Sequence, residues 1–221
     1  MRVVIAGGHG KIALLLEELL AARGNGVVGL IRNPGHVADV QATGAAPIVC
    51  DLESASVDDV ASNLDGADAV VFAAGAGPGS GAARKDTVDR AASALMAEAA
   101  ERAGVHRFVQ ISSMGAGKPP EPGSEEVWAA YITAKTAAED DLRGRPLDWT
   151  ILRPGGLTDD PGTGRVLLDE SVPRGQVPRA DVAAVITALL DAEGTTGRTL
   201  ELVGGDTPVE DAVRAQERSS G

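Results

Sequence analysis

The sequence predicts an α/β fold in which a doubly wound, mainly parallel sheet carries helices on both faces. Three observations support this prediction: short apolar runs alternate with amphipathic stretches, the runs are almost continuously Val, Ile and Leu, and the stretches follow helical spacing. Continuous apolar runs are typical of strands buried on both faces of a parallel sheet. Their regular alternation with helical patterns indicates successive βαβ units in one sheet.

The apolar runs give the predicted strands, and the amphipathic stretches give the helices between them. The strands are expected at Val3–Ala6, Val27–Ile31, Ile48–Cys50, Ala69–Ala73, Phe108–Ile111, Trp149–Leu152 and Leu200–Val203. Apolar residues at i, i+3, i+4 and i+7, the spacing of one helix face, recur over 12–19, 88–99 and 182–189.

Three long linkers each follow a predicted strand: Gly75–Gly81, Gly115–Gly123 and Gly155–Gln176. In doubly wound folds ligands bind at the carboxyl ends of the strands. We therefore expect these linkers to line one crevice. Residues 1–214 are predicted to form a single domain, with a small substrate-side cap at 155–178 and a frayed tail at 215–221.

Composition excludes several function classes. The formal net charge of −12 argues against a nucleic-acid or anionic-membrane partner, because both need clustered Lys and Arg. The start of the chain does not read as a signal peptide, and no apolar run reaches the roughly 20 residues of a membrane span. A cytoplasmic monomer or homodimer is expected. Cys50 is the one cysteine, so no intrachain disulfide can form, and no histidine has neighbours that suggest a metal site.

A glycine-rich turn follows the first strand and precedes the first helix. Gly7 permits a tight turn, Gly10 lets the backbone approach a pyrophosphate, and Ala13 is small enough for the helix to pack closely. The free amides of the helix amino terminus then face the phosphates. This context predicts a dinucleotide site of the Rossmann type. Its residues in this segment are Gly7, His9, Gly10, Lys11 and Ile12, with His9 either a phosphate contact or a solvent-facing turn residue.

The end of the second strand indicates which dinucleotide is bound. NAD-specific sites usually carry an acid about 20 residues beyond the glycine turn, where it holds the ribose 2′-hydroxyl. The segment Gly29–Pro34 has no acid and offers Arg32 instead. A guanidinium suits a 2′-phosphate in charge and geometry, although an arginine at a strand end can also be merely solvated. NADP(H) is predicted, with NAD(H) as the alternative.

The next two strand ends supply further cofactor contacts. Asp51 and Leu52 follow the third strand, where an adenine ring would pass, although Asp51 could instead cap a helix. Small residues follow the fourth strand and would let the cofactor lie against the backbone. They are Ala73, Ala74 and Gly75.

Hydroxyl groups and a lysine in the second half are candidates for catalysis. Ser112 and Ser113 follow the fifth strand, and Tyr131 and Lys135 share one helix face at i and i+4. An ammonium near a phenol favours its ionised form, which suits proton transfer at neutral pH. Lys135 could also hold the nicotinamide ribose, Ser112 is also a candidate cofactor contact, and a serine could bind a substrate carbonyl oxygen. The alternative is that the Tyr–Lys pair is structural packing.

The sequence resembles the short-chain dehydrogenase/reductase superfamily, and in particular its atypical, compact NAD(P)-binding branch of NmrA-like and biliverdin/flavin-reductase-like proteins. The segments that carry the resemblance are 7–13, 107–113, 131–135 with 138–139, 149–157 and 179–183. The resemblance implies that the glycine turn and Arg32 bind the cofactor and that Ser113 (or Ser112), Tyr131 and Lys135 act in catalysis. It also implies that Arg153, Pro154 and Gly155 close over the nicotinamide end.

The expected function is an NADP(H)-dependent oxidoreductase that transfers hydride between nicotinamide and a small carbonyl or alcohol substrate. Three alternatives remain open at this point: a non-catalytic protein that senses NADP(H), a flavin- or biliverdin-type reductase in which Tyr131 is idle, and a sugar-epimerase-like enzyme. The small cap argues against a large nucleotide-sugar.

Overall fold

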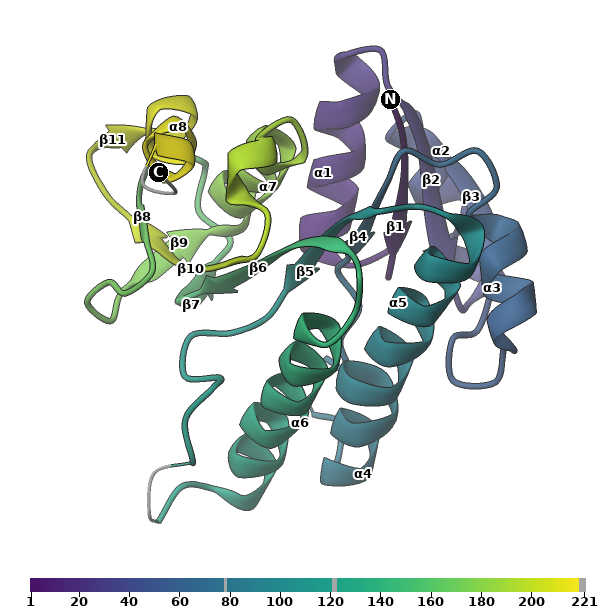
Figure 1. The fold of residues 1–221 in the computed structure, drawn as a ribbon, viewed down its shortest axis with the longest axis horizontal. Coiled ribbons are helices and arrows are strands. Elements are labelled where there is room, and N and C mark those ends of the chain that lie inside the picture. The colour runs from purple at the N-terminus through teal and green to yellow at the C-terminus, as the bar shows by residue number, and fades with distance from the viewer. Residues whose placement is uncertain (78, 121–122, 219–221) are drawn as a thin grey trace.

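The computed structural model describes residues 1–77, 79–120 and 123–218, and Figure 1 shows its central sheet with helices on both faces. Within these residues, nine strands lie in the order β11-β8-β10-β6-β5-β4-β1-β2-β3. They are β1 (Arg2–Ala6), β2 (Gly26–Ile31), β3 (Ala46–Val49), β4 (Ala69–Phe72), β5 (Arg107–Ile111), β6 (Asp148–Pro154), β8 (Arg165–Asp169), β10 (Arg198–Gly204) and β11 (Thr207–Pro208).

The strand order is that of a doubly wound Rossmann fold, which confirms the predicted fold class. The run β3-β2-β1-β4-β5-β6 is parallel throughout, and the direction of winding reverses between β1 and β4. A crevice forms at such a reversal, outside the carboxyl ends of the strands. All seven predicted strands are found within a few residues of their expected bounds.

Two helical layers enclose the sheet. One face is covered by α1 (Lys11–Ala22), α2 (Val37–Ala42), α7 (Arg179–Leu190) and α8 (Val209–Arg218). The other is covered by α3 (Val57–Asn63), α5 (Ala92–Ala103) and α6 (Glu126–Arg143). The short α4 (Ala82–Arg84) continues through a π-helical turn, Lys85–Ala91, into α5. Single-turn helices lie at Pro34–His36 and Glu193–Thr195.

Strand β1 explains why the core has two halves. Its side chains alternate between the faces, so Val3 and Ile5 pack under α1 and α7 while Val4 packs under α5. Each of these side chains is fully buried. Complete burial of such a side chain contributes about 1.5–3 kcal/mol relative to exposure. This two-sided burial is why the run lacks polar alternation.

The predicted linker Gly155–Gln176 contains strands that the sequence did not reveal. β7 (Gly156–Thr158) and β9 (Gln176–Pro178) form a separate parallel pair, and β8 lies antiparallel to β10 in the main sheet. β7 and β9 have three residues each, which is too short for a recognisable pattern. β8 buries Val166 and Leu168 but leaves Leu167 exposed, so it reads as alternation instead of an apolar run.

The end of the chain differs from the expected frayed tail over 215–221 in one respect. α8 extends to Arg218, and residues 219–221 lie outside the described residues. No helix in the described part of the chain is both long enough and apolar enough to cross a membrane.

Candidate cofactor and substrate site

The glycine turn joins β1 to α1 and is held by backbone hydrogen bonds. The amides of Gly7 and Gly8 donate to the Leu30 carbonyl oxygen at 3.2 and 2.9 Å, and the Gly10 amide donates to the Gly7 oxygen at 2.8 Å. Gly7 has φ +79°, and a Cβ there would lie 2.7 Å from the Cα of Ala74. Glycine is therefore required at this position.

Helix α1 presents its amino terminus to the crevice. Gly10 precedes the helix, and among the described residues no side chain caps its first amides. The first turn also lacks an acidic residue that would offset the positive end of the helix dipole. An anionic group is therefore favoured here, and the turn fits a dinucleotide diphosphate.

A first cavity of about 320 Å³, the cofactor pocket, lies at the carboxyl ends of β1 to β4. Nine of the predicted cofactor residues line it. They are Gly7, His9, Gly10, Arg32, Asp51, Leu52, Ala73, Ala74 and Gly75. Asn33, His36, Glu53 and Arg84 are among the other lining residues. The linker Gly75–Gly81 thus contributes to this pocket through its first residues.

Two arginines share one carboxylate on the wall of the cofactor pocket. Arg32 Nη1 and Arg84 Nη2 donate to Glu53 Oε2 at 2.7 and 2.8 Å, and the Thr87 hydroxyl donates to Glu53 Oε1 at 2.7 Å. The hydrogen bond from Thr87, with those from the arginines, holds the pKa of Glu53 below its usual value. The sequence predicted Arg32 as a cofactor residue but gave no indication of Glu53 or Arg84. Arg84 reaches the pocket from beyond the Gly75–Gly81 linker, and no local pattern predicts that approach.

The side chains of His9, Lys11 and Ile12 each contact other parts of the chain, and His9 also lines the cofactor pocket. His9 stacks on His36 with 3.5 Å between ring centroids, and His9 Nε2 lies 2.8 Å from Asp39 Oδ2. Lys11 Nζ donates to Asp159 Oδ2 at 2.5 Å, and Arg179 Nη1 donates to Asp159 Oδ1 at 2.6 Å. Lys11 thus links α1 to the segment after β7. Ile12 packs against the core.

Tyr131 and Lys135 lie on α6, as predicted. The contact between them is made by the Lys135 ammonium with the aromatic ring of Tyr131. Lys135 Nζ is 5.8 Å from the Tyr131 ring centroid, and it donates to the Ile111 carbonyl oxygen at 3.1 Å. It also lies 3.2 Å from Asp89 Oδ1, and both side chains are buried. Asp89 Oδ2 accepts a hydrogen bond from the Ala76 amide at 3.2 Å. Lys135 therefore fastens α6 to β5 and, through Asp89 of the π-helical turn, to the loop after β4.

A second cavity of about 610 Å³, the substrate pocket, lies at the carboxyl ends of β5 and β6. Of the predicted site residues, Ser113, Tyr131, Pro154 and Gly155 line it. The linkers Gly115–Gly123 and Gly155–Gln176 both contribute residues to this wall. The Ser113 hydroxyl donates only a long hydrogen bond, 3.4 Å, to the Met114 carbonyl oxygen. Tyr131 and Ser113 thus border one cavity from different elements.

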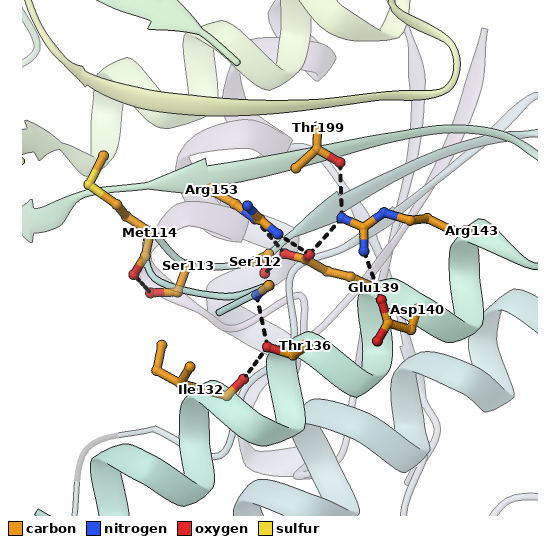
Figure 2. A network of polar contacts seen from close by, with 11 residues as sticks. Ser112, Ser113, Met114, Ile132, Thr136, Glu139, Asp140, Arg143, Arg153 and Thr199 are labelled. Carbon is orange, nitrogen blue, oxygen red and sulfur yellow. Dashed lines mark hydrogen bonds and ion pairs between the residues drawn. The ribbon is translucent and has the colours of Figure 1, made fainter. Parts of the chain in front are cut away.

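Ser112 and Arg153, both predicted cofactor residues, belong to a buried network around Glu139 (Figure 2). Ser112 Oγ donates to Glu139 Oε1 at 2.5 Å, and Arg153 donates to both carboxylate oxygens. Arg143 Nη2 donates to Glu139 Oε2 at 2.8 Å. Burial alone would raise the pKa of Glu139, but the bonds from Arg153, Ser112 and Arg143 hold it below its usual value. Neither Ser112 nor Arg153 lines the cofactor pocket or the substrate pocket.

Fold and site together define a compact Rossmann protein that binds a nicotinamide dinucleotide. The chain belongs to the NAD(P)H-binding family, whose model matches residues 7–193, and to the atypical short-chain dehydrogenase/reductase branch. Within the described residues, no group of three or more His, Cys, Asp or Glu side chains could hold a metal ion.

Known proteins similar to this chain include reductase- and epimerase-type members. YhfK of Bacillus subtilis, named an uncharacterized sugar epimerase, is 34% identical over 215 residues, which cover 97% of this chain and 99% of YhfK. A Bacillus halodurans structure, provisionally assigned as an NAD-dependent epimerase/dehydratase, has a TM-score of 0.90 and 34% identity, covering 97% and 99% of the two chains. ChuY of Escherichia coli O157:H7, an anaerobillin reductase, has a TM-score of 0.77 and 28% identity, covering 93% and 98%.

Proposed function

We propose that this protein is an NADP(H)-dependent oxidoreductase that transfers hydride between nicotinamide and a small carbonyl or alcohol substrate. One observation carries the proposal: Tyr131 and Ser113, two hydroxyl groups suited to a carbonyl oxygen, border a cavity at the same sheet edge as the glycine-turn pocket. The cofactor pocket would hold the dinucleotide, and the substrate pocket would hold the reacting carbonyl.

When bound in the cofactor pocket, NADPH would supply the hydride that reduces a carbonyl carbon, and Gly7, Gly10 and Arg32 are among the residues that would hold it. The Tyr131 hydroxyl gives its proton to the carbonyl oxygen, so the product is the alcohol and Tyr131 is reprotonated from solvent. The Ser113 hydroxyl donates a hydrogen bond to the same oxygen as negative charge develops on it. Lys135 holds the position of the Tyr131 ring through its bonds to Ile111 and Asp89.

The charges of the cofactor pocket support NADP(H) over NAD(H). Arg32 and Arg84 both reach the pocket wall, and the Glu53 carboxylate between them is fully engaged by cations and by Thr87. A 2′-phosphate would replace this carboxylate as the partner of the guanidinium groups.

The experiment is NADPH oxidation with a panel of aldehydes and ketones, comparing the wild type with Tyr131→Phe. We expect kcat to fall by about 10²-fold or more, because general acid catalysis contributes about 10²–10⁴-fold. NADPH affinity, measured by calorimetry, should stay unchanged. Thr133→Ala, an exposed position on the same helix, is the matched control and should keep full activity. Unchanged carbonyl reduction by Tyr131→Phe would contradict the proposed role.

The contacts of Lys135 favour a second candidate, a reductase that delivers hydride directly to a flavin or tetrapyrrole. The Lys135 ammonium lies against the Tyr131 ring and is bound to Ile111 and Asp89, which is the arrangement of a structural pair. In that case Tyr131→Phe would reduce flavin or biliverdin at the wild-type rate.

A further inference from the structure

Two lysine ammonium groups from different elements approach the ring of Tyr131. Lys85 Nζ lies 5.1 Å from the ring centroid, and Lys135 Nζ lies 5.8 Å from it. Lys135 belongs to α6, as Tyr131 does, whereas Lys85 is the first residue of the π-helical turn Lys85–Ala91. Lys85 is 8% exposed and Lys135 is 4% exposed. Because both side chains are buried, water screens neither charge from the ring efficiently.

The two lysines differ in the partners that balance their charges. Lys135 Nζ lies 3.2 Å from Asp89 Oδ1, and this ion pair is buried on both sides. Lys85 Nζ donates to the Gly77 carbonyl oxygen at 2.9 Å, and no Asp or Glu in the described part of the chain forms an ion pair with it. The charge of Lys135 is therefore compensated by a carboxylate, whereas Lys85 brings an uncompensated positive charge to Tyr131.

The other charged groups near α6 do not contact the Tyr131 ring. Lys118, Arg174 and Arg179 line the cavity that Tyr131 borders, but among the described contacts only Lys85 and Lys135 place a cation over the ring. Further charged side chains on the elements packed against α6 are either bound to partners of opposite charge or exposed: Arg84, Glu98, Glu101, Arg102, Asp148 and Arg153. Asp86 and Arg90 of the π-helical turn pair with each other.

The π-helical turn that carries Lys85 reaches both pockets. It connects α4 to α5, beside α6 in Figure 1. Its Thr87 donates to Glu53 on the wall of the cofactor pocket, and its Asp89 accepts from the Ala76 amide and pairs with Lys135. Short π-helical segments within α-helices occur frequently at functional sites. The geometry of this turn thus sets the position of Lys85 against Tyr131.

We propose that Lys85 supports the proton transfer by Tyr131, because its ammonium stabilises the phenolate that forms when the tyrosine gives up its proton. This inference rests on the proposed function, in which the O–H bond of Tyr131 breaks as a new O–H bond forms on the substrate oxygen. The phenolate charge is shared between the oxygen and the ring, so a cation over the ring favours it. The phenolate then takes a proton from solvent. Lys85 acts through Tyr131 and is therefore a positioning residue, while Lys135 anchors α6.

The first test observes Tyr131 directly, without turnover. Tyr131 is the one tyrosine in the chain, so the ultraviolet absorbance of tyrosinate during a pH titration reports this group alone. We expect Lys85→Gln to move the midpoint of that titration by about one pH unit or more towards alkaline pH, because it removes an opposite charge from beside the phenolate. Lys85→Arg, which keeps the charge, should restore most of the shift. Circular dichroism at each pH verifies that the protein stays folded.

Two further variants make the titration specific. Arg90→Gln removes an exposed cation from the same π-helical turn and should leave the midpoint unchanged. Lys85→Met keeps the length of the side chain without its charge and should shift the midpoint as Lys85→Gln does. It serves as the second neutral variant if Lys85→Gln does not fold.

The second test measures NADPH oxidation with the best aldehyde of the panel above. We expect kcat of Lys85→Gln to fall by roughly three- to tenfold, since only part of the charge on Tyr131 develops in the transition state. Lys85→Arg should recover most of the rate, and the KM for NADPH should stay within about twofold of wild type. In a Tyr131→Phe background Lys85→Gln should cause no further loss, because the two residues act as one unit.

The outcomes separate this inference from the proposed function. An unchanged tyrosinate midpoint in a folded Lys85→Gln protein, or a loss of rate that persists in the Tyr131→Phe background, would overturn the role of Lys85. The oxidoreductase would stand in either case if Tyr131→Phe alone abolishes carbonyl reduction. A shifted midpoint in a protein that reduces no carbonyl would count against the oxidoreductase and would leave the coupling between Lys85 and Tyr131 intact.

Discussion

The cofactor pocket and the substrate pocket lie at the same edge of the sheet but differ in the residues that line them. The cofactor pocket includes glycines and alanines that follow strands β1 and β4, such as Gly7, Gly10 and Ala74, where the main chain is accessible. The substrate pocket is walled by large side chains, such as Trp128 and Arg174, carried by longer segments. The difference indicates that the glycine turn binds a dinucleotide through its main chain. The substrate, in contrast, would be bound by side chains that come from distant parts of the sequence.

The supports beneath the two pockets also differ, and each contains a buried glutamate in a different environment. Glu139, behind the substrate pocket, is bound by Arg153, Arg143 and Ser112. Glu17, under the glycine turn, accepts one hydrogen bond, 3.2 Å, from Thr43, and its Oε1 has no hydrogen-bond partner among the described residues. The first carboxylate is compensated and the second is not.

The largest effect on stability is expected from Glu139→Gln, which removes the negative charge between Arg153 and Arg143. Breaking a buried ion pair costs about 3–5 kcal/mol, because the remaining charge stays buried without its partner. We expect a loss of about 3 kcal/mol in the free energy of unfolding, which lowers the Tm by roughly 6–12 °C for a chain of this size. Thermal unfolding followed by circular dichroism at pH 7 measures it.

The control for Glu139 is Asp140, its neighbour on α6. Asp140 also pairs with Arg143, but its side chain is 67% exposed, so Asp140→Asn should change the stability by about 0.5 kcal/mol or less. The pKa of Glu139 is lowered in the folded protein, so its contribution is present above the usual pKa near 4.5 and is lost as the pH falls through the folded value. The difference between wild type and Glu139→Gln should therefore shrink in acid, and a constant difference would contradict the charge argument.

An effect of comparable size but opposite sign, confined to alkaline pH, is expected from Glu17→Gln. Burial raises the pKa of Glu17 from 4.5 to about 8, against the lowering effect of the Thr43 hydrogen bond. Between these values the folded state keeps a proton that the unfolded state has lost, so stability falls as the pH rises from about 4.5 to about 8 and then levels off. Glu17→Gln removes that penalty and should stabilise the protein by about 2–4 kcal/mol at pH 9 and by little at pH 5.

Unfolding of both proteins in urea at pH 5 and pH 9 tests this expectation. Glu18→Gln, which changes an exposed carboxylate on the same helix, should show no such pH dependence. If Glu17→Gln is no more stable than wild type at pH 9, Glu17 is not the source of a pH-dependent penalty beneath the turn.

The same difference between the two pockets explains how much of each could be predicted from the sequence. The strands, the glycine turn and nine residues of the cofactor pocket could be predicted, because βαβ periodicity and the Gly7-to-Ala13 pattern are local. Tyr131 and Ser113 could be predicted from the Tyr131–Lys135 spacing, from the serines that follow a strand and from the family resemblance, and both line the substrate pocket. Lys118 and Arg174, which also line the substrate pocket, could not be predicted, because the loop after β5 and the segment between β8 and β9 reach this pocket only in the folded chain. Glu139 lies within a segment that resembles the family. The sequence did not indicate, however, that its carboxylate would accept hydrogen bonds from Arg153 and Ser112.

The smallest expected effect concerns Arg32 and Arg84, the two arginines that pair with Glu53 in the cofactor pocket. Arg32 is 54% exposed, so its contact with a 2′-phosphate is worth about 1 kcal/mol, and Arg32→Ala should weaken NADPH binding by roughly fivefold. NADH lacks that phosphate, so its affinity should change by less than about twofold. Calorimetric titration of both dinucleotides measures this, and NADPH should raise the Tm of the wild type more than NADH does.

Glu53→Gln sharpens the same argument because it acts in the opposite direction. The substitution removes the carboxylate that competes with a 2′-phosphate for Arg32 and Arg84, so NADPH should bind severalfold more tightly, while NADH stays unchanged. Glu18→Gln alters the net charge equally at a distance from the pocket and serves as the control. If Arg32→Ala weakened both dinucleotides alike, or if Glu53→Gln weakened NADPH, the arginine pair would not be reading the 2′-phosphate, and recognition in this pocket would depend on the main chain alone.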